Sequence, residues 1–324
     1  MFAAYCRDFV ESFGQGWNRF WYTPAHPLPL GIMRILTGLL LLASLLTYTS
    51  DLQRFLSNYG VLPVDTVVAL QTRALENGGE KLPWRWSYLD GLGGRELEIA
   101  HYVGIAVAVA YTLGIFTRYT AVAALIVLLS YLHRNPTVTY YHERMLAFLM
   151  FYLSLGPCGA TLSIDRWLAN RKGLPPVQPS WAAGVSLRLI QIHMAVVSFM
   201  MASSKLSSMM AATWWGGTAV WWLAVTPDGP MIDVSWINRG HRLIINFWTH
   251  AIAFFELAMP FLIWNRLARP LLFVLSIMVW TSVMLLTGQV LFTLSLMTGM
   301  VSFLSGETLL ALCPMCRRTK VATA

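Results

Sequence analysis

The chain has 324 residues, of which 56% are hydrophobic and only 12% are charged, and its mean hydropathy is positive. Apolar runs of membrane-spanning length recur from end to end, which favours an all-α, polytopic membrane helix bundle over a soluble globular fold. The formal net charge of +8 is then mostly a signal of membrane topology, and nucleic acid is not expected as a partner.

Residues 1–28 are expected to form an amphipathic N-terminal segment that ends in a Pro-rich turn, without a cleavable signal peptide. Residues 29–312 are expected to form a single transmembrane helical domain, and residues 313–324 a cytoplasmic tail. We predict about eight crossings, plus a short apolar piece at residues 214–225 that is re-entrant or interfacial because it is too short to cross. The predicted spans are residues 30–48, 99–116, 119–133, 145–162, 187–204, 247–264, 270–286 and 291–312.

The distribution of Lys and Arg in the short loops orients these spans. Segments that hold basic residues without interspersed acids are expected on the cytoplasmic side, which gives an N-in, C-in topology in a plasma membrane, as in the bacterial inner membrane. The basic residues of those segments are Arg118, Arg166, Arg171, Lys172, Arg266, Arg269, Arg317, Arg318 and Lys320.

A polar stripe runs along the predicted span at residues 187–204. Gln191, Ser198 and Lys205 are spaced by seven residues, so they drift only about 20° per step and share one helix face. A lysine at a membrane helix end either snorkels to the head groups or belongs to a site that faces the bundle interior. The aligned Gln and Ser, and the Trp214-Trp215 pair that follows, favour a site.

The loop at residues 133–144 lies on the same predicted outer side as Lys205. It is dense in hydrogen-bonding side chains for a connection between two hydrophobic spans. Loop residues held by a rigid scaffold often carry function, although a histidine such as His142 can also be an ordinary solvated loop residue. Asn246 and His250, four residues apart, can reach the same outer cavity.

Several short motifs, in the same order along nearly the whole chain, resemble the horizontally transferred transmembrane domain family. That family includes the membrane portion of the vitamin K-dependent gamma-glutamyl carboxylase. The motifs are Arg34-Ile-Leu-Thr-Gly38, Tyr59-Gly60-Val61-Leu62-Pro63, Trp84-Arg85-Trp86-Ser87, His133-Arg134-Asn135-Pro136, Leu162-Ser163-Ile164-Asp165, Arg188-Leu-Ile-Gln191, Ser204-Lys205-Leu206 and Phe255-Glu256-Leu-Ala-Met-Pro260.

The resemblance implies a quinol-dependent enzyme of the membrane. Lys205 matches the base that deprotonates vitamin K hydroquinone, and His142 matches a histidine implicated in the active site. The cofactors implied are vitamin K hydroquinone or a related quinol, with O2 and CO2 as co-substrates, and the products are an epoxide and a carboxylated glutamate. The residues expected to line the quinol site are Gln191, Ser198, Tyr140, Tyr141, Trp214, Trp215 and His250.

The substrate is left open, because no lumenal domain for docking a protein substrate is expected beyond residue 324. A small peptide, a partner subunit, or quinol oxidation alone each remain possible. The competing class is a non-enzymatic membrane factor for the maturation or assembly of a secreted peptide, in which the polar stripe only fixes helix packing. A transporter is disfavoured, since the sequence has no inverted repeat.

Other polar residues are interpreted as structural. Glu256 lies within a predicted span and needs a partner, which we expect to be Arg34 or Arg188. His193 lies about 120° from the Lys205 stripe and is expected to be packed or paired. Cys313 and Cys316 form a C-x-x-C pair in the tail that suits a dithiol or half a zinc site. No metal-ligand cluster is expected.

Overall fold

The computed structural model describes residues 2–78, 85–135, 139–207, 211–225, 230–232 and 242–312. These residues form helices, with no strand among them, and an isolated bridge pairs Ala25 with Ser180. The all-α fold class is therefore confirmed. Cys313 and Cys316 lie outside the described residues, as do Trp84 and Pro136 of the quoted motifs.

Within the described part of the chain, five helices are long and apolar enough to cross a membrane. A span of about 20 residues matches the ~30 Å hydrocarbon core because each helical residue rises ~1.5 Å. The five are α2 (Leu28–Tyr48), α5 (Gly94–Leu113), α9 (Trp181–Ser207), α12 (Arg242–Leu262) and α13 (Ala268–Thr287).

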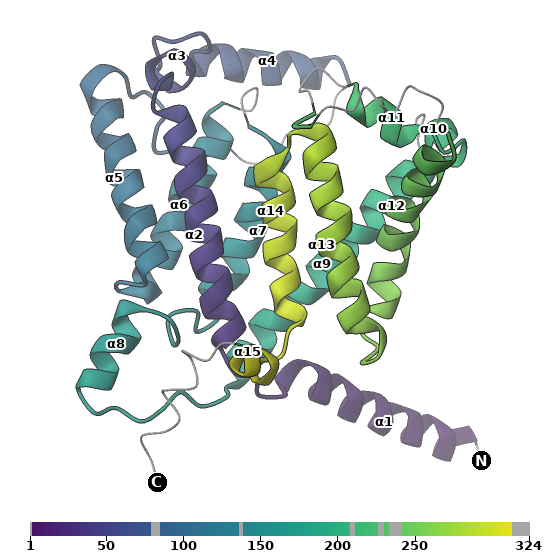
Figure 1. Ribbon diagram of the computed structural model, residues 1–324. Helices are drawn as coiled ribbons and strands as arrows, with labels where there is room; N and C mark the ends of the chain where they lie inside the picture. The colour runs from purple at the N-terminus through teal and green to yellow at the C-terminus, as the bar shows by residue number, and fades with distance from the viewer. Residues whose placement is uncertain are drawn as a thin grey trace.

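Three further helices run alongside these in the bundle (Figure 1): α6 (Thr117–Arg134), α7 (Tyr141–Leu155) and α14 (Val290–Met300). They occupy the places of the predicted spans at residues 119–133, 145–162 and 291–312, but α7 and α14 are short. The continuous span predicted at 291–312 is wrong. A 3-10 turn, η2 (Val301–Phe303), follows α14, and Ser305 then caps a separate helix, α15 (Gly306–Leu312), by accepting from the Thr308 N–H at 3.1 Å.

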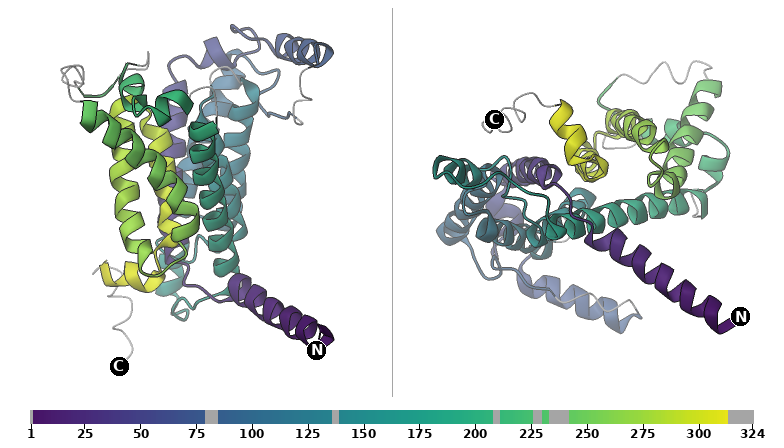
Figure 2. Two further views of the ribbon diagram at one scale, coloured as in Figure 1. Left: turned by 90° about the vertical axis from the view of Figure 1, so that its right-hand side faces the viewer. Right: turned by 90° about the horizontal axis from the view of Figure 1, so that it is seen from below.

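The bundle has two distinct ends (Figures 1 and 2). The α4 end carries α3 (Leu52–Leu56), α4 (Val64–Glu76), α10 (Ala211–Trp215) and α11 (Ala219–Ala224). The α1 end carries α1 (Phe2–Tyr22), α8 (Ile164–Arg171) and α15. The apolar piece at residues 214–225 therefore forms parts of two short helices across one end of the bundle, which agrees with the interfacial alternative.

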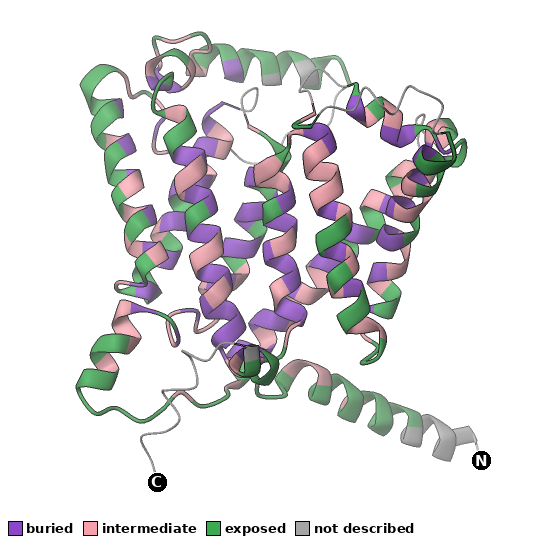
Figure 3. Ribbon diagram, viewed as in Figure 1, coloured by how far each residue is buried: buried purple, intermediate pink, exposed green. Residues whose placement is uncertain are grey.

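Burial is distributed as expected for a helix bundle whose outer surface meets an apolar medium. Buried side chains gather on the inward faces of the long helices, and the outward faces are exposed (Figure 3). Many exposed side chains on the spans are large and apolar, such as Leu39 and Leu46 on α2, and Leu271 and Met278 on α13. This surface suits lipid and would be poorly solvated in water.

A buried arginine ties the connections together at the α4 end. The Arg134 guanidinium donates to the carbonyl of Ser57 at 2.9 Å and to that of Leu62 at 3.1 Å. Arg85 donates through Nε to the carbonyl of His133 at 2.7 Å. Three of the motifs quoted for the resemblance, far apart in the sequence, therefore meet in one polar cluster.

A second buried arginine, Arg34, ties connecting segments together at the α1 end. Arg34 donates to the carbonyl of Leu162 at 2.5 Å. Asp165, three residues further on, accepts hydrogen bonds from the backbone N–H groups of Phe116 at 2.9 Å and Thr117 at 2.7 Å. The carboxylate thus accepts hydrogen bonds from N–H groups that the start of α6 would otherwise leave unpaired. Its negative charge is also stabilised by the positive end of the α6 dipole.

Candidate functional site

Among the described residues, Lys205 and Glu256 form an ion pair between two of the long helices. Lys205 lies in the last turn of α9, and Glu256 lies within α12. The ammonium hydrogen-bonds to both carboxylate oxygens, and the Glu256 side chain is only 1% exposed, against 18% for Lys205. The lysine Nζ also lies 5.0 Å from the centroid of the buried Trp214 ring. The lysine is therefore the accessible member of the pair.

Proline and serine residues define how α9 and α12 meet at this pair. Pro260 lies inside α12 and has no N–H, so the helix cannot supply the usual hydrogen bond to the carbonyl of Glu256, four residues earlier. The buried Ser198 hydroxyl of α9 donates to that carbonyl at 2.9 Å. A Pro-containing membrane helix commonly recovers its lost backbone bond from a neighbouring Ser or Thr. Ser198 therefore positions Glu256 beside Lys205.

The partner predicted for Glu256 was wrong. Arg34 donates to backbone carbonyls at the α1 end, and Arg188 hydrogen-bonds to Phe20 and Gln191. Arg188 precedes Lys205 by 17 residues on the same helix, about 25 Å along its axis. Neither arginine therefore reaches the position that Lys205 takes.

Gln191 lies outside this site, although it shares the helix with Lys205. Its amide donates to the carbonyl of Ser302 at 2.6 Å, and its oxygen accepts from Arg188 at 2.9 Å. The stripe of Gln191, Ser198 and Lys205 thus divides into a packing contact toward the α1 end and a second contact that builds the ion pair. The seven-residue spacing predicts that the three side chains share one helix face, but it does not predict which residues they contact.

The other aromatic and histidine residues predicted for the site are arranged unevenly. Trp215 is exposed, and its indole N–H donates to the carbonyl of Leu206 at 3.1 Å, beside Lys205. His250 hydrogen-bonds through Nδ1 to its own helix at Asn246, at 2.9 Å, and stacks on Phe254 at 6.2 Å between centroids. In the described part of the chain no hydrogen bond joins His250 to Lys205 or Glu256.

A second polar cluster surrounds His142 at the start of α7. His142 is buried, and its Nε2 lies 3.0 Å from the Ser44 hydroxyl of α2. Glu143, also buried, accepts from the Tyr48 hydroxyl at 2.5 Å and from the backbone N–H of Tyr140 at 2.8 Å. Sequence reasoning missed this role of Glu143, although an acid three residues after a helix N-cap is a known capping signal.

The predicted quinol-binding tyrosines lie at the rim of this cluster. Tyr140 and Tyr141 are both exposed. The Tyr140 ring stacks against His142 at 6.2 Å between centroids, and the Tyr141 ring lies 6.3 Å from Phe292 of α14. The tyrosines therefore connect His142 to the surface at the α4 end.

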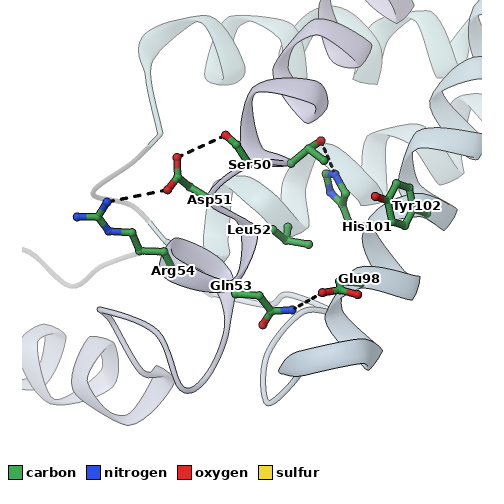
Figure 4. A pocket seen from close by; sticks show the side chains of 9 residues that line it. Ser50, Asp51, Leu52, Gln53, Arg54, Glu98, His101 and Tyr102 are labelled. Carbon is green, nitrogen blue, oxygen red and sulfur yellow. Dashed lines mark hydrogen bonds and ion pairs between the residues drawn. The ribbon is translucent and has the colours of Figure 1, made fainter.

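A third buried polar group, His101, also escaped the sequence reasoning. Its Nδ1 lies 2.6 Å from the Tyr131 hydroxyl and its Nε2 lies 3.0 Å from the Thr49 hydroxyl. Thr49 and His101 line a pocket of about 320 Å³ at the α4 end, together with Asp51, Arg54 and Glu98 (Figure 4). A histidine inside an apolar run was the available signal. His193, by contrast, is packed as predicted, against Phe148 at 4.3 Å between centroids.

The two predicted catalytic residues contact different helices. His142 of α7 hydrogen-bonds to Ser44 of α2, and Lys205 of α9 pairs with Glu256 of α12. Near its start α9 contacts α7, where the Ser186 hydroxyl donates to the carbonyl of Tyr152 at 2.7 Å. Near its end α9 contacts α12 through Ser198 and Lys205. Among the described residues, Lys205 and His142 share no hydrogen-bonding partner, so a common cavity stays a prediction.

No protein-family model, curated protein or solved structure matches this chain. The described residues contain no group of three or more His, Cys, Asp or Glu side chains that could hold a metal ion. The described residues thus form helices without strands, five of them able to span a membrane, with an ion pair between two of these five.

Proposed function

We propose that this chain is a quinol-dependent membrane enzyme that resembles gamma-glutamyl carboxylase, with Lys205 as the general base. The observation that carries the proposal is the Lys205–Glu256 pair, in which a deeply buried carboxylate holds a lysine that is itself partly accessible. An intramembrane ionisable pair is costly to maintain and commonly marks a functional site.

The neighbours of Lys205 suit a flat aromatic ligand. Trp214 is buried 5.0 Å below the ammonium, and Trp215 is exposed beside the end of α9. A quinol head group stacked on indole would present its hydroxyl to Lys205, while its tail stays in lipid. Trp214, Trp215 and Ser198 therefore remain in the proposed binding set, whereas the contacts of Gln191 give it a packing role.

Base catalysis requires an unprotonated amine, and Glu256 is placed to accept the proton. Transfer of one ammonium proton to a carboxylate oxygen leaves neutral Lys205 hydrogen-bonded to a neutral carboxylic acid, and no net charge changes in the interior. The amine then takes the quinol hydroxyl proton, which typically contributes ~10²–10⁴-fold to the rate. Reaction of a deprotonated quinol with O2 supplies an epoxide and a strong base for carboxylation of a glutamate by CO2.

His142 is proposed as a second catalytic residue that orients the quinol or its oxygenated product. Its burial beside Tyr140 and its bond to Ser44 hold the ring in one orientation. This role requires His142 and Lys205 to approach one ligand from two sides, with Tyr140 and Tyr141 at the entrance.

The proposed topology has eight crossings, with both termini in the cytoplasm of a bacterial cell. Its support is the position of α1 and α15 at one end of the bundle (Figure 1), since an odd number of crossings would separate them. Three crossings by α6, α7 and α14, added to the five long helices, give the even number. The same end also carries basic residues of α8 and of the α12–α13 turn: Arg166, Arg171, Arg266 and Arg269.

The alternative function is a non-enzymatic membrane factor for maturation or assembly of a secreted peptide. The observation that favours it is that Lys205, Glu256 and Ser198 also fasten α9 to α12. An ion pair that only fixes packing would give the same geometry.

Epoxide formation by the purified protein separates the two functions. The assay supplies reduced vitamin K and O2, with or without a glutamate-containing peptide and labelled CO2. Lys205→Met alone leaves Glu256 buried without a partner and is expected to cost ~3–5 kcal/mol of stability. Lys205→Met/Glu256→Met removes both charges and should restore folding, yet lower epoxidation by at least ~10²-fold.

Wild-type protein that forms no epoxide with any quinol would leave the maturation factor as the better function. A folded double variant with wild-type turnover would retain the quinol chemistry and rule out Lys205 as its base. Epoxide without labelled peptide would retain the quinol chemistry and remove the carboxylation step.

A further inference from the structure

Two arginines meet at the α1 end of the bundle, around an aromatic pair. Arg188 of α9 donates through Nε to the carbonyl of Phe20 at 3.2 Å, and its guanidinium carbon lies 4.7 Å from the centroid of the Phe20 ring. Phe20 in turn packs against Trp264, with 5.8 Å between ring centroids. Arg269 donates to the carbonyls of Ile263, at 3.2 Å, and Trp264, at 3.4 Å.

Neither arginine is neutralised within the described residues, where no carboxylate forms a salt bridge with Arg188 or Arg269. Each guanidinium has five N–H donors and directs only some of them at carbonyl or amide oxygens. Arg269 also stands in the first turn of α13, where a cation is unfavourable because the helix dipole is positive, and that turn contains no acid. The cluster therefore lacks a negative charge.

An exposed aromatic stripe leads from this cluster along α1. Phe9, Phe13, Trp17 and Trp21 follow one another at four-residue spacing, with ring centroids 6.4, 6.1 and 5.8 Å apart. The helix leaves the bundle sideways (Figure 2), and Phe9, Phe13 and Trp17 are all exposed. Such a helix at the level where the spans end is typical of one that lies in the membrane interface.

We propose that Arg188 and Arg269 together bind the phosphate of an anionic phospholipid, whose acyl chains lie along the aromatic stripe of α1. Arginine forks match phosphate oxygens, and two of them can hold one phosphate with charge-assisted hydrogen bonds. The basic α1 end suits the anionic cytoplasmic leaflet. The lipid would fasten α1, α9 and α13 to one another and set the depth of α1. This inference rests on membrane embedding and not on quinol chemistry.

Arg269→Gln tests the site, with Arg266→Gln as its matched control. Arg266 is an exposed arginine in the same turn, so the two variants remove the same charge. Thermal unfolding is measured in nanodiscs of phosphatidylcholine with increasing phosphatidylglycerol. We expect wild-type protein and Arg266→Gln to gain stability with phosphatidylglycerol, and Arg269→Gln to need roughly tenfold more of it.

Three outcomes would overturn the proposal. Equal losses for Arg266→Gln and Arg269→Gln would mean general surface charge. Equal stabilisation by inorganic phosphate in detergent would mean a free-anion site. Trp17 fluorescence that brominated phospholipids do not quench would remove α1 from the membrane. Should Arg269→Gln fold poorly, Arg269→Lys takes its place, because lysine keeps the charge and lacks the two-pronged guanidinium. Its gain in stability with phosphatidylglycerol is expected to be smaller than that of wild-type protein and of Arg266→Gln.

Discussion

At the residue scale, a side chain of α9 replaces a backbone hydrogen-bond donor that α12 lacks. Pro260 removes the N–H that would reach the carbonyl of Glu256, and Ser198 of the neighbouring helix supplies a hydroxyl in its place. An unpaired carbonyl in an apolar interior would cost several kcal/mol. The same contact brings the Glu256 carboxylate to Lys205, so a packing requirement and a candidate catalytic pair share one serine.

Asp165 gives a prediction of pH dependence at a single residue outside the spans. Burial acts to raise the pKa of its carboxyl, but hydrogen bonds from Thr117 and Phe116 prevail and hold that pKa below its usual range. A carboxyl with a lowered pKa in the folded state stabilises the fold above its unfolded-state pKa, which is ~3.9 for Asp. That stabilisation is lost as the pH falls through the folded-state pKa.

We therefore expect Asp165→Asn, which removes the charge and one of the two acceptor oxygens, to lower the free energy of unfolding near pH 6 by about 1–2 kcal/mol, the scale of a lost hydrogen bond to a charged group. The gap in melting temperature between wild type and variant should narrow as the pH is lowered below ~4. Asp51→Asn is the control, because Asp51 is half exposed and its ion pair with Arg54 is 3.9 Å long. A gap that is constant from pH 6 to pH 3 would contradict the assignment.

Some of these residues could be predicted from the sequence and others could not. Lys205 and Ser198 were found from their spacing alone, because a polar stripe on an apolar helix is visible in the chain. The partner of Glu256 was not, since pairing across helices depends on which faces meet and at what depth. Glu143 and His101 each have a local signal, but their partners across the bundle, Tyr48 and Tyr131, lie on other helices and cannot be read from it.

At the scale of helices, small residues decide how closely α2 and α5 approach. A Cβ at Gly38 would lie 2.3 Å from the Thr112 hydroxyl oxygen and 3.0 Å from the Thr112 Cα. That hydroxyl already donates to the carbonyl of Ala108 at 2.7 Å, so rotating it away loses a hydrogen bond. The backbone of α5 would have to move. Close approach through glycine is the usual way in which membrane helices gain packing contacts.

Gly38→Ala is therefore expected to destabilise the bundle by about 1–3 kcal/mol, the usual cost of overpacking, against a gain of less than ~1 kcal/mol in helix propensity. Gly299→Ala in α14 is the control. The three atoms nearest to the added methyl there all belong to the Met194 side chain, which is flexible enough to shift. Melting temperatures in one detergent compare the two, and equal losses would mean that the contact with the Thr112 backbone is unimportant.

The boundaries of the elements were predictable where a local signal exists. Gly114 ends α5 in the left-handed conformation, φ 72°, and a helix end was expected near it. The break between α14 and α15 was missed, because hydropathy averaged over residues 291–312 hides the Ser302, Ser305 and Gly306 positions at which the helix stops. Hydropathy measures how apolar a segment is and not whether its backbone stays helical.

At the scale of the whole molecule, the two ends of the bundle differ in how charge is arranged. At the α4 end, Asp51, Asp90 and Glu98 lie among Arg54 and Arg85 in ion pairs and hydrogen bonds. At the α1 end, Arg166, Arg171, Arg266 and Arg269 form no salt bridge with a described carboxylate, and α1 presents its aromatic stripe. This asymmetry is what the short-loop rule detected in the sequence, and it makes the orientation testable.

Cysteine accessibility in whole cells tests the orientation and the even number of crossings together. Single cysteines at Tyr59, which is 87% exposed at the α4 end, and at Arg171 of α8 are placed in a chain whose own four cysteines are replaced. An impermeant maleimide should label Tyr59→Cys in intact cells and Arg171→Cys only after permeabilisation. A third cysteine at Gln15, an exposed residue of α1 off the aromatic stripe, should behave like Arg171→Cys, because α1 and α8 share an end (Figure 1).

Labelling of Arg171→Cys from outside would reverse the topology, and it would also move the proposed lipid-binding arginines to the outer leaflet, where anionic lipids are scarcer. Labelling of Gln15→Cys and Arg171→Cys from opposite sides would show an odd number of crossings between α1 and α8. One of α6 and α7 would then fail to cross. The shorter of the two is α7, with 15 residues and a length of about 22 Å. A helix of this length crosses only if the membrane thins around it or polar residues cap its ends. The capping box at one end of α7, in which the buried Glu143 accepts from the backbone N–H of the exposed Tyr140, supplies such a polar cap.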